Sequence, residues 1–168
     1  MIQLTEAPAR SLSFSWDDPA AHRRQMSEMA GIDYIRAIQS GKLAPVAFAR
    51  LLGLAIPFAE PGRVTFSYTP EELWLNPMGT LHGGIIGTLL DTAMGMAVHS
   101  TLPAGTGFTT LEYKVNFMRP VLESTGLVFA EAKVLHTGRT QAVVEARLVD
   151  ASGKRYALAT STCAILQR

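Results

Sequence analysis

One carboxylate stands in a long stretch that has no other formal charge. Between Leu73 and Leu111 the only charged residue is Asp91. Burying a carboxylate costs free energy unless it is paired or hydrogen-bonded, and such groups are over-represented at functional sites. We therefore expect Asp91 to belong to a functional site. The structural alternative is a buried carboxylate that accepts backbone hydrogen bonds.

A second group with chemical capacity lies just before Asp91, in the run Asn-Pro-Met-Gly-Thr-Leu-His-Gly-Gly from 76 to 84. Gly83 and Gly84 fall where a helix should begin, and a helix N-terminus presents free N–H groups and a partial positive charge. Those donors suit the oxyanion of an acyl transfer. Asn76 and His82 add side-chain hydrogen bonds. Alternatively, Asn76 is a turn residue, His82 a helix cap, and the glycines a tight packing contact.

The spacing of the two groups limits how they can cooperate. Asp91 lies eight residues after Gly83, which is about 12 Å along a helix. A carbonyl bound at Gly83 is therefore out of reach of Asp91 on the same helix. If both serve one site, Asp91 must come from a second copy of the chain, and a symmetric dimer would hold two such sites.

Helices are predicted in two parts of the chain. From Gly83 to about Ser100, apolar residues keep one wide face and small residues fill other positions, which indicates an enclosed helix. In the first 50 residues, a helix start at 17–19 leads into one broken helix or two short ones that reach Gly41. Another short helix is predicted from Pro45 to Leu52.

Strands are predicted by alternation of apolar and polar residues. One precedes the long helix, at Val64–Thr69. The strands after the helix are Thr109–Met118, with Leu111, Tyr113, Val115 and Phe117 on one face, then Gly126–Leu135, Gln141–Asp150 and Tyr156–Leu166. This order implies an α+β fold, with an antiparallel sheet wrapped around one long helix. We expect a single domain, made of an N-terminal helical extension (1–50) and a main part (51–168).

Composition excludes several classes of protein. The chain has 168 residues, of which 48% are hydrophobic and 17% charged, against roughly 25% charged in average domains. The net charge of +1 predicts no binding to nucleic acid or to an anionic membrane, and Asp91 within the most apolar window disfavours a membrane span. No signal peptide is apparent in residues 1–16, so a cytoplasmic protein is expected.

The sequence also lacks the motifs of other hydrolases. The single cysteine, Cys163, excludes an intrachain disulfide and a multi-cysteine zinc site, and it reads as buried and inert. Neither G-x-S-x-G nor H-E-x-x-H is present, which disfavours a serine α/β-hydrolase and a zinc hydrolase. No metal and no separate cofactor are expected.

Three runs of the sequence resemble one family. The run from Asn76 to Asp91, the run Val-Asn-Phe-Met-Arg-Pro-Val from 115 to 121, and the run Leu-His-Thr-Gly-Arg from 135 to 139 resemble hotdog-fold acyl-CoA thioesterases of the phenylacetic-acid-degradation (PaaI) type. The resemblance covers about residues 54–166. The first 45 or so residues have no clear counterpart in it.

The resemblance implies a role for each matching residue. The Gly83 amide polarises the thioester carbonyl with Asn76 as its partner, and His82 is the histidine that precedes the glycine. Asp91 activates water or attacks directly, and Thr110, with Thr109 as runner-up, helps to hold the water. The implied contacts with coenzyme A are Gly84, Gly138 and Arg139. The family forms homodimers with sites between subunits, often paired into homotetramers.

The expected function is therefore hydrolysis of an acyl- or arylacyl-CoA to free acid and coenzyme A. One alternative is a non-catalytic acyl-CoA sensor with the same fold, although binding alone would not require a carboxylate at Asp91. Another is a hydratase or dehydratase of the same fold, but the His and acid placement typical of those enzymes is not found. The N-terminal segment is expected to border the acyl tunnel and to influence the acyl length that is accepted.

Overall fold

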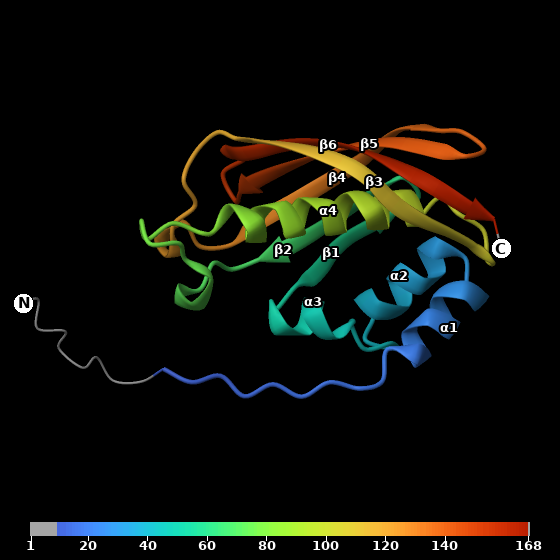
Figure 1. The fold of residues 1–168 in the computed structure, drawn as a ribbon, viewed down its shortest axis with the longest axis horizontal. Coiled ribbons are helices and arrows are strands. Elements are labelled where there is room, and N and C mark those ends of the chain that lie inside the picture. Colours follow the sequence, from blue (N-terminus) through green and yellow to red (C-terminus); the bar gives the residue numbers. More distant parts are fainter. Residues whose placement is uncertain (1–9, 168) are drawn as a thin grey trace, which may run out of the picture.

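The computed structural model describes residues 10–167 and shows a six-stranded antiparallel sheet curved around one long helix (Figure 1). The expected α+β arrangement is thus confirmed. Residues 1–9, part of the segment in which no signal peptide is predicted, lie outside the described residues. The helices are α1 (Ala20–Glu28), α2 (Gly31–Gln39), α3 (Ala47–Leu51) and α4 (Gly83–His99), with short 3-10 turns at Glu72–Trp74 and Glu123–Thr125. The strands are β1 (Ala55–Glu60), β2 (Arg63–Tyr68), β3 (Thr106–Phe117), β4 (Val128–Thr137), β5 (Gln141–Asp150) and β6 (Arg155–Gln167).

Helix α4 is the centre of the hydrophobic core. Six of its apolar side chains have no exposed surface: Leu89, Leu90, Ala93, Met94, Ala97 and Val98. Full burial of one leucine side chain stabilises a fold by roughly 1.5–3 kcal/mol relative to exposure. The predicted helix from Gly83 to about Ser100 is confirmed, and its low charge reflects enclosure by the sheet on one side and by α2 on another.

The strand order is β1-β2-β4-β5-β6-β3, so β1 and β3 are the two edges of the sheet. Strands β2 to β6 confirm the predicted strands to within three residues at each end. Strand β1 is an additional element that the alternation does not predict. It contains Pro57, which has no N–H to donate and is therefore tolerated only at an edge or a bulge.

Strand β3 departs from a regular alternation. Its pairing with β6 shifts between Thr110 and Glu112, so Leu111 lies in a β-bulge. The expected single face with Leu111, Tyr113 and Phe117 is therefore wrong for Leu111, which is 56% exposed. The rings of Tyr113 and Phe117 do lie against α4. A bulge inserts one residue and re-aims the side chains beside it, and this cannot be read from periodicity.

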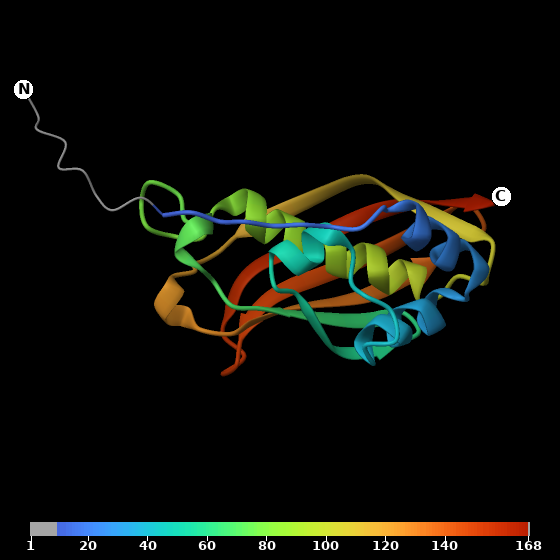
Figure 2. The same cartoon turned by 90° about the horizontal axis from the view of Figure 1, so that it is seen from below.

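The N-terminal helices lie on the side of α4 away from β3–β6 (Figures 1 and 2). The broken pattern before Gly41 resolves as two helices, and Gly31 begins the second one instead of interrupting the first. A Cβ at Gly31 would lie 1.8 Å from the His99 carbonyl oxygen, so only glycine permits this approach of α2 to α4. Tyr34 and Ile35 of α2 belong to the core shared with the sheet.

Candidate active site

One stripe of α4 faces β3, and it consists of glycines with a single carboxylate. Gly83, Gly87, Asp91 and Gly95 recur every four residues, which places them on one face of the helix. An aromatic ring of β3 lies over each glycine. A Cβ added to Gly83 would lie 3.3 Å from the Phe117 ring. The missing side chains therefore allow the strand to lie close against the helix.

The same arrangement repeats on both sides of the carboxylate. A Cβ added to Gly87 would lie 3.1 Å from the Tyr113 hydroxyl, and one added to Gly95 would lie 2.8 Å from the Phe108 ring. Asp91 is midway between these two glycines on the helix. The carboxylate therefore sits in the gap between two aromatic rings of the neighbouring strand.

Asp91 has one side-chain partner in that gap. The Thr110 hydroxyl donates a hydrogen bond to Asp91 Oδ1 across 3.0 Å. Both side chains line a cavity of about 410 Å³. The other residues of its wall are mostly apolar, aromatic or small: Phe48, Thr88, Thr92, Gly95, Met96, Phe108 and Tyr113. A half-buried carboxylate thus faces an open space in which an apolar group could lie.

The N-terminus of α4 holds a free donor. His82 is the N-cap residue, and its Nδ1 accepts a hydrogen bond of 2.9 Å from the Gly84 N–H. The Ile85 and Ile86 N–H groups donate to the His82 carbonyl. The Gly83 N–H donates no hydrogen bond to any group within residues 10–167. Because the positive end of the helix dipole lies here, this N–H is well placed to donate a hydrogen bond to an oxygen that develops negative charge.

Asn76 organises the loop that leads into α4. Its Oδ1 accepts from the Met78 N–H at 2.9 Å and from the Thr80 N–H at 3.3 Å, while its Nδ2 donates to Thr80 Oγ1 at 2.9 Å. Asn76 is therefore a turn residue in the folded chain, as the structural alternative held. A side-chain amide has two donor hydrogens, so one of them remains for another partner.

Gly138 and Arg139 lie in the turn between β4 and β5. Arg139 is exposed and makes no ion pair with any residue the structure describes. The turn lies at the Thr109 end of β3, because Ala164 of β6 pairs with both Gln141 and Thr109. Neighbouring strands are about 4.8 Å apart, so the turn begins roughly 10 Å from Thr109 across the sheet.

The structure thus places most of the predicted site residues in two groups at α4, while Gly138 and Arg139 lie apart in the turn between β4 and β5. Asp91 meets Thr110, whereas Asn76, His82, Gly83 and Gly84 gather at the start of α4. Within one chain the two groups stay eight helical residues apart, about 12 Å. Thr109 is exposed and makes no hydrogen bond to Asp91, in contrast to Thr110. Sequence reasoning did not include Phe48, Met96, Phe108 and Tyr113 in the site.

Comparisons with known proteins place the chain in a family. The model of the thioesterase superfamily matches residues 78–157. Human acyl-coenzyme A thioesterase 13 is 34% identical over 112 residues, covering 66% of this chain and 79% of that protein. The chain belongs to the thioesterase superfamily. The hotdog fold and the thioester hydrolase activity expected from the sequence are thereby confirmed.

Solved structures support the assignment of this thioesterase. A phenylacetic acid degradation-related protein from Ralstonia eutropha superposes with a TM-score of 0.71 at 32% identity, covering 78% of this chain and 98% of that one. A Streptococcus mutans protein, crystallised with acetyl CoA, superposes with a TM-score of 0.63 at 27% identity, covering 68% and 90%. The expected resemblance to PaaI-type proteins is confirmed by these matches.

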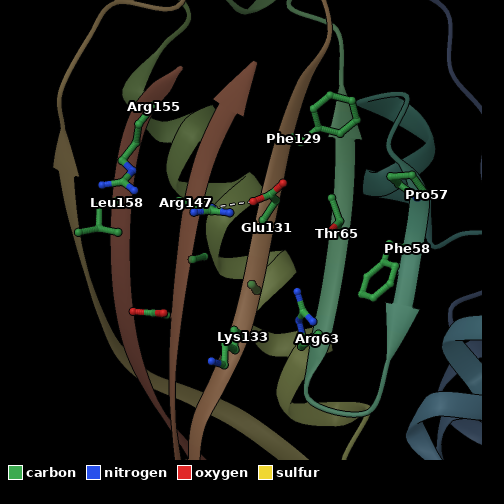
Figure 3. Close-up of a pocket in the computed structure, with 13 residues that line it drawn as sticks. Pro57, Phe58, Arg63, Thr65, Phe129, Glu131, Lys133, Arg147, Arg155 and Leu158 are labelled. Carbon is green, nitrogen blue, oxygen red and sulfur yellow. Dashed lines mark hydrogen bonds and ion pairs between the residues drawn. The ribbon is translucent and has the colours of Figure 1, made fainter. Parts of the chain in front are cut away.

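The thioesterase has a second cavity, of about 680 Å³, on the outer face of the sheet. Figure 3 shows α4 behind the sheet, on the far side from the labelled side chains. Cations and carboxylates mix here, and Arg147 donates to Glu131 across 2.6 Å. Arg63 lies with its guanidinium 5.6 Å from the centre of the Phe58 ring. The sheet separates this groove from Asp91, so it has no part in the chemistry considered at α4.

One further titratable group of the thioesterase, the thiol of Cys163, lies close to the site. Cys163 pairs with Thr110 across β3 and β6, and it is fully buried. Burial raises the pKa of its thiol, which keeps it protonated and unsuited to nucleophilic attack.

In the described part of the chain, no cluster of three or more His, Cys, Asp or Glu side chains could hold a metal ion. None of the described helices is long and apolar enough to cross a membrane.

Proposed function

We propose that this thioesterase hydrolyses acyl-CoA thioesters, with Asp91 as the residue that activates the attacking water. The observation that carries the proposal is the hydrogen bond from Thr110 to Asp91 inside a mostly apolar cavity. The relatives support the coenzyme A part, because one is named an acyl-coenzyme A thioesterase and another was crystallised with acetyl CoA.

In the proposed reaction, the water oxygen attacks the thioester carbonyl carbon while an Asp91 carboxylate oxygen takes one of its protons. Thr110 occupies Oδ1, which orients the carboxylate and leaves Oδ2 for the water. The resulting oxyanion collapses, the C–S bond breaks, and the coenzyme A sulfur leaves with the proton. General-base assistance of this kind is worth about 10²–10⁴ in rate.

The oxyanion is proposed to lie at the N-terminus of α4. The Gly83 N–H donates to it, and the second amide hydrogen of Asn76 is the partner donor. His82 fixes the first turn of the helix through its bond to the Gly84 N–H. Because Gly83 and Asp91 are too far apart on one helix, each site takes Gly83 from one subunit and Asp91 from the other.

The edge strand β3 supports a homodimer. It exposes large apolar side chains where a surface edge would otherwise be polar: Leu111 (56%), Tyr113 (44%) and Phe117 (58%). An unpaired apolar edge is an association surface. We propose that two copies pair along this edge and its neighbouring α4, and that such dimers can pair into a homotetramer.

The coenzyme A moiety is proposed to reach the turn between β4 and β5. Arg139 supplies a cation there that forms no ion pair within residues 10–167, and Gly138 precedes it in the same turn. Gly84, at the start of α4, is the third proposed contact. Coenzyme A enters as part of the substrate, and no separate cofactor or metal is proposed. The single reduced, buried cysteine fits a cytoplasmic location.

The test is release of the coenzyme A thiol from a panel of acyl-CoAs by the parent and by Asp91→Asn. We expect the substitution to lower kcat by at least about 100-fold with little change in KM. Asp33→Asn, in α2 and outside the cavity, is the matched control and should leave turnover unchanged. Parent-like turnover by Asp91→Asn would remove the proposed role, and binding without thiol release by the parent would indicate an acyl-CoA sensor.

A further inference from the structure

The Asp91 cavity has one wall residue from the N-terminal part of the chain. Phe48, in α3, lines the cavity together with side chains of α4 and β3. Its side chain is partly exposed, at 43%, although its neighbours in α3 are better covered. A large apolar ring that is exposed toward a cavity is available for contact with an apolar ligand.

Helix α3 is fixed by its own buried residues and not by Phe48. Ala49 and Leu52 are each 6% exposed and belong to the core. The chain then turns at Gly53, whose φ of +65° favours glycine, and the Leu54 N–H donates to the Ala49 carbonyl at 2.9 Å. The ring of Phe48 can therefore be changed without removing what holds the helix.

The extended segment before α1 lies along the outer side of α3 (Figure 2). The Arg50 guanidinium lies 5.8 Å from the centre of the Phe14 ring and 3.6 Å from an Asp17 carboxylate oxygen, and Phe14 stacks with Trp16. Such exposed pairs contribute little stability each. They place α3 between this segment on one side and the Asp91 cavity on the other.

One end of the cavity wall, around Gly95, is held by contacts with the core. Phe108 fills the space where a side chain of Gly95 would be, and it also packs against the buried ring of His99 at 5.6 Å between centroids. Met96 completes this end. Neither Phe108 nor the α4 backbone can retreat, because both contact the core. On the α3 side, a longer acyl group would meet the partly exposed ring of Phe48, which the core contacts do not fix.

We infer that Phe48 sets the upper limit on the length of the acyl group, so that the N-terminal helical segment is a specificity element of the thioesterase. The inference rests on the proposed acyl-CoA hydrolysis and adds the wall that selects among its substrates. Phe48 contacts the end of the acyl chain and takes no part in the reaction of the carbonyl carbon.

The experiment measures kcat/KM for a series of straight-chain acyl-CoAs of increasing length with the full-length protein. Phe48→Ala should shift the preferred length upward, with the ratio of long-chain to short-chain kcat/KM rising roughly tenfold. Phe48→Trp should shift it downward. Phe58→Ala, which removes a similarly exposed ring from β1 on the outer groove, is the control and should leave the ratio unchanged.

The result can be separated from failure of the proposed function. The same ratio is measured as binding of non-hydrolysable thioether analogues, so that a protein without turnover still reports on length selection. An active parent whose length preference is identical in Phe48→Ala and Phe48→Trp would overturn the inference alone. A parent that neither hydrolyses nor binds the series would overturn both proposals. Thermal unfolding and size-exclusion of each variant show that fold and assembly are retained.

Discussion

At the scale of single residues, the account depends on the contact between Thr110 and Asp91. Thr110 shares with Phe108, two residues earlier, the face of β3 that meets α4, and the bulge after Thr110 moves Leu111 off that face. The neighbouring Thr109 points away and is exposed. Two adjacent threonines of one strand thus offer a matched pair for testing the bond.

Replacement of Thr110 by Val keeps the shape of the side chain and removes the donor. A hydrogen bond to a charged group is worth about 1.5–3 kcal/mol, so kcat should fall roughly 10-fold or more while the melting temperature changes little. Thr110→Ser should retain most of the turnover. Steady-state kinetics of both variants and of Thr109→Val check this, and an equal loss in Thr109→Val would contradict the assigned bond.

At the scale of elements, the sequence predicts what depends on local pattern. Helix α4 and the turn between β5 and β6 follow from apolar spacing and from glycine, and both are found. Strand β1 is not predicted, because it has only six residues and contains Pro57, so its sequence does not alternate regularly. The bulge at Leu111 and the contact of Phe48 with the Asp91 cavity depend on partners distant in sequence, which a local pattern does not contain.

The glycine stripe of α4 is also only partly predictable from the sequence, because its partners lie on a distant strand. Gly83 was identified for its backbone donor, but Gly87 and Gly95 read only as small residues. The structure explains these two glycines, because Tyr113 occupies the space beside Gly87 and Phe108 occupies the space beside Gly95. Asp91, the carboxylate of the stripe, stands out in the sequence by itself, because it is the one charge in a long apolar run.

The last turn of α4 carries a pH-sensitive element, His99. It is fully buried between the Tyr34 and Phe108 rings, and neither ring nitrogen has a hydrogen-bond partner among residues 10–167. Burial lowers its pKa to about 4, whereas an unfolded histidine titrates near 6.5. Between these values the unfolded chain binds a proton that the folded chain does not.

The contribution of His99 to the free energy of unfolding should therefore be fully present above pH 6.5. As the pH falls toward 4, this group should lower the free energy of unfolding by up to roughly 3 kcal/mol. His99→Leu should flatten that decline. Urea unfolding at pH 7.5 and pH 5 measures the difference, with His136→Leu, an exposed histidine of β4, as the control. An unchanged slope in His99→Leu would show that another group carries the pH dependence.

At the scale of the whole molecule, the central claim is that one site needs two chains. The fold places a carboxylate in the middle of α4 and, at its start, the Gly83 N–H that we propose as the oxyanion donor, about 12 Å apart. The apolar edge of β3 supplies a surface on which a second copy can bring the two groups together. The low charge of the segment from 73 to 111 thus fits burial by the sheet and by a partner subunit.

Gly83→Pro provides a clean loss of the donor. Gly83 is the first helical residue, where proline is tolerated, and His82 before it has the extended conformation that a following proline prefers (φ −59°, ψ 134°). The substitution should therefore remove the N–H without disrupting α4. The added Cβ would lie 3.3 Å from the Phe117 ring, which is 58% exposed and has room to shift by the small distance required. Asp91→Asn removes the carboxylate, so each variant alone should be nearly inactive.

The most direct measurement is the activity of a heterodimer of these two variants, co-expressed with different tags and purified through both. If the sites lie between subunits, one site combines the intact Gly83 of one chain with the intact Asp91 of the other, and the heterodimer should recover about half of the parent's activity per dimer. If both groups act within one chain, every site stays defective. A heterodimer no more active than the separate variants would contradict the account.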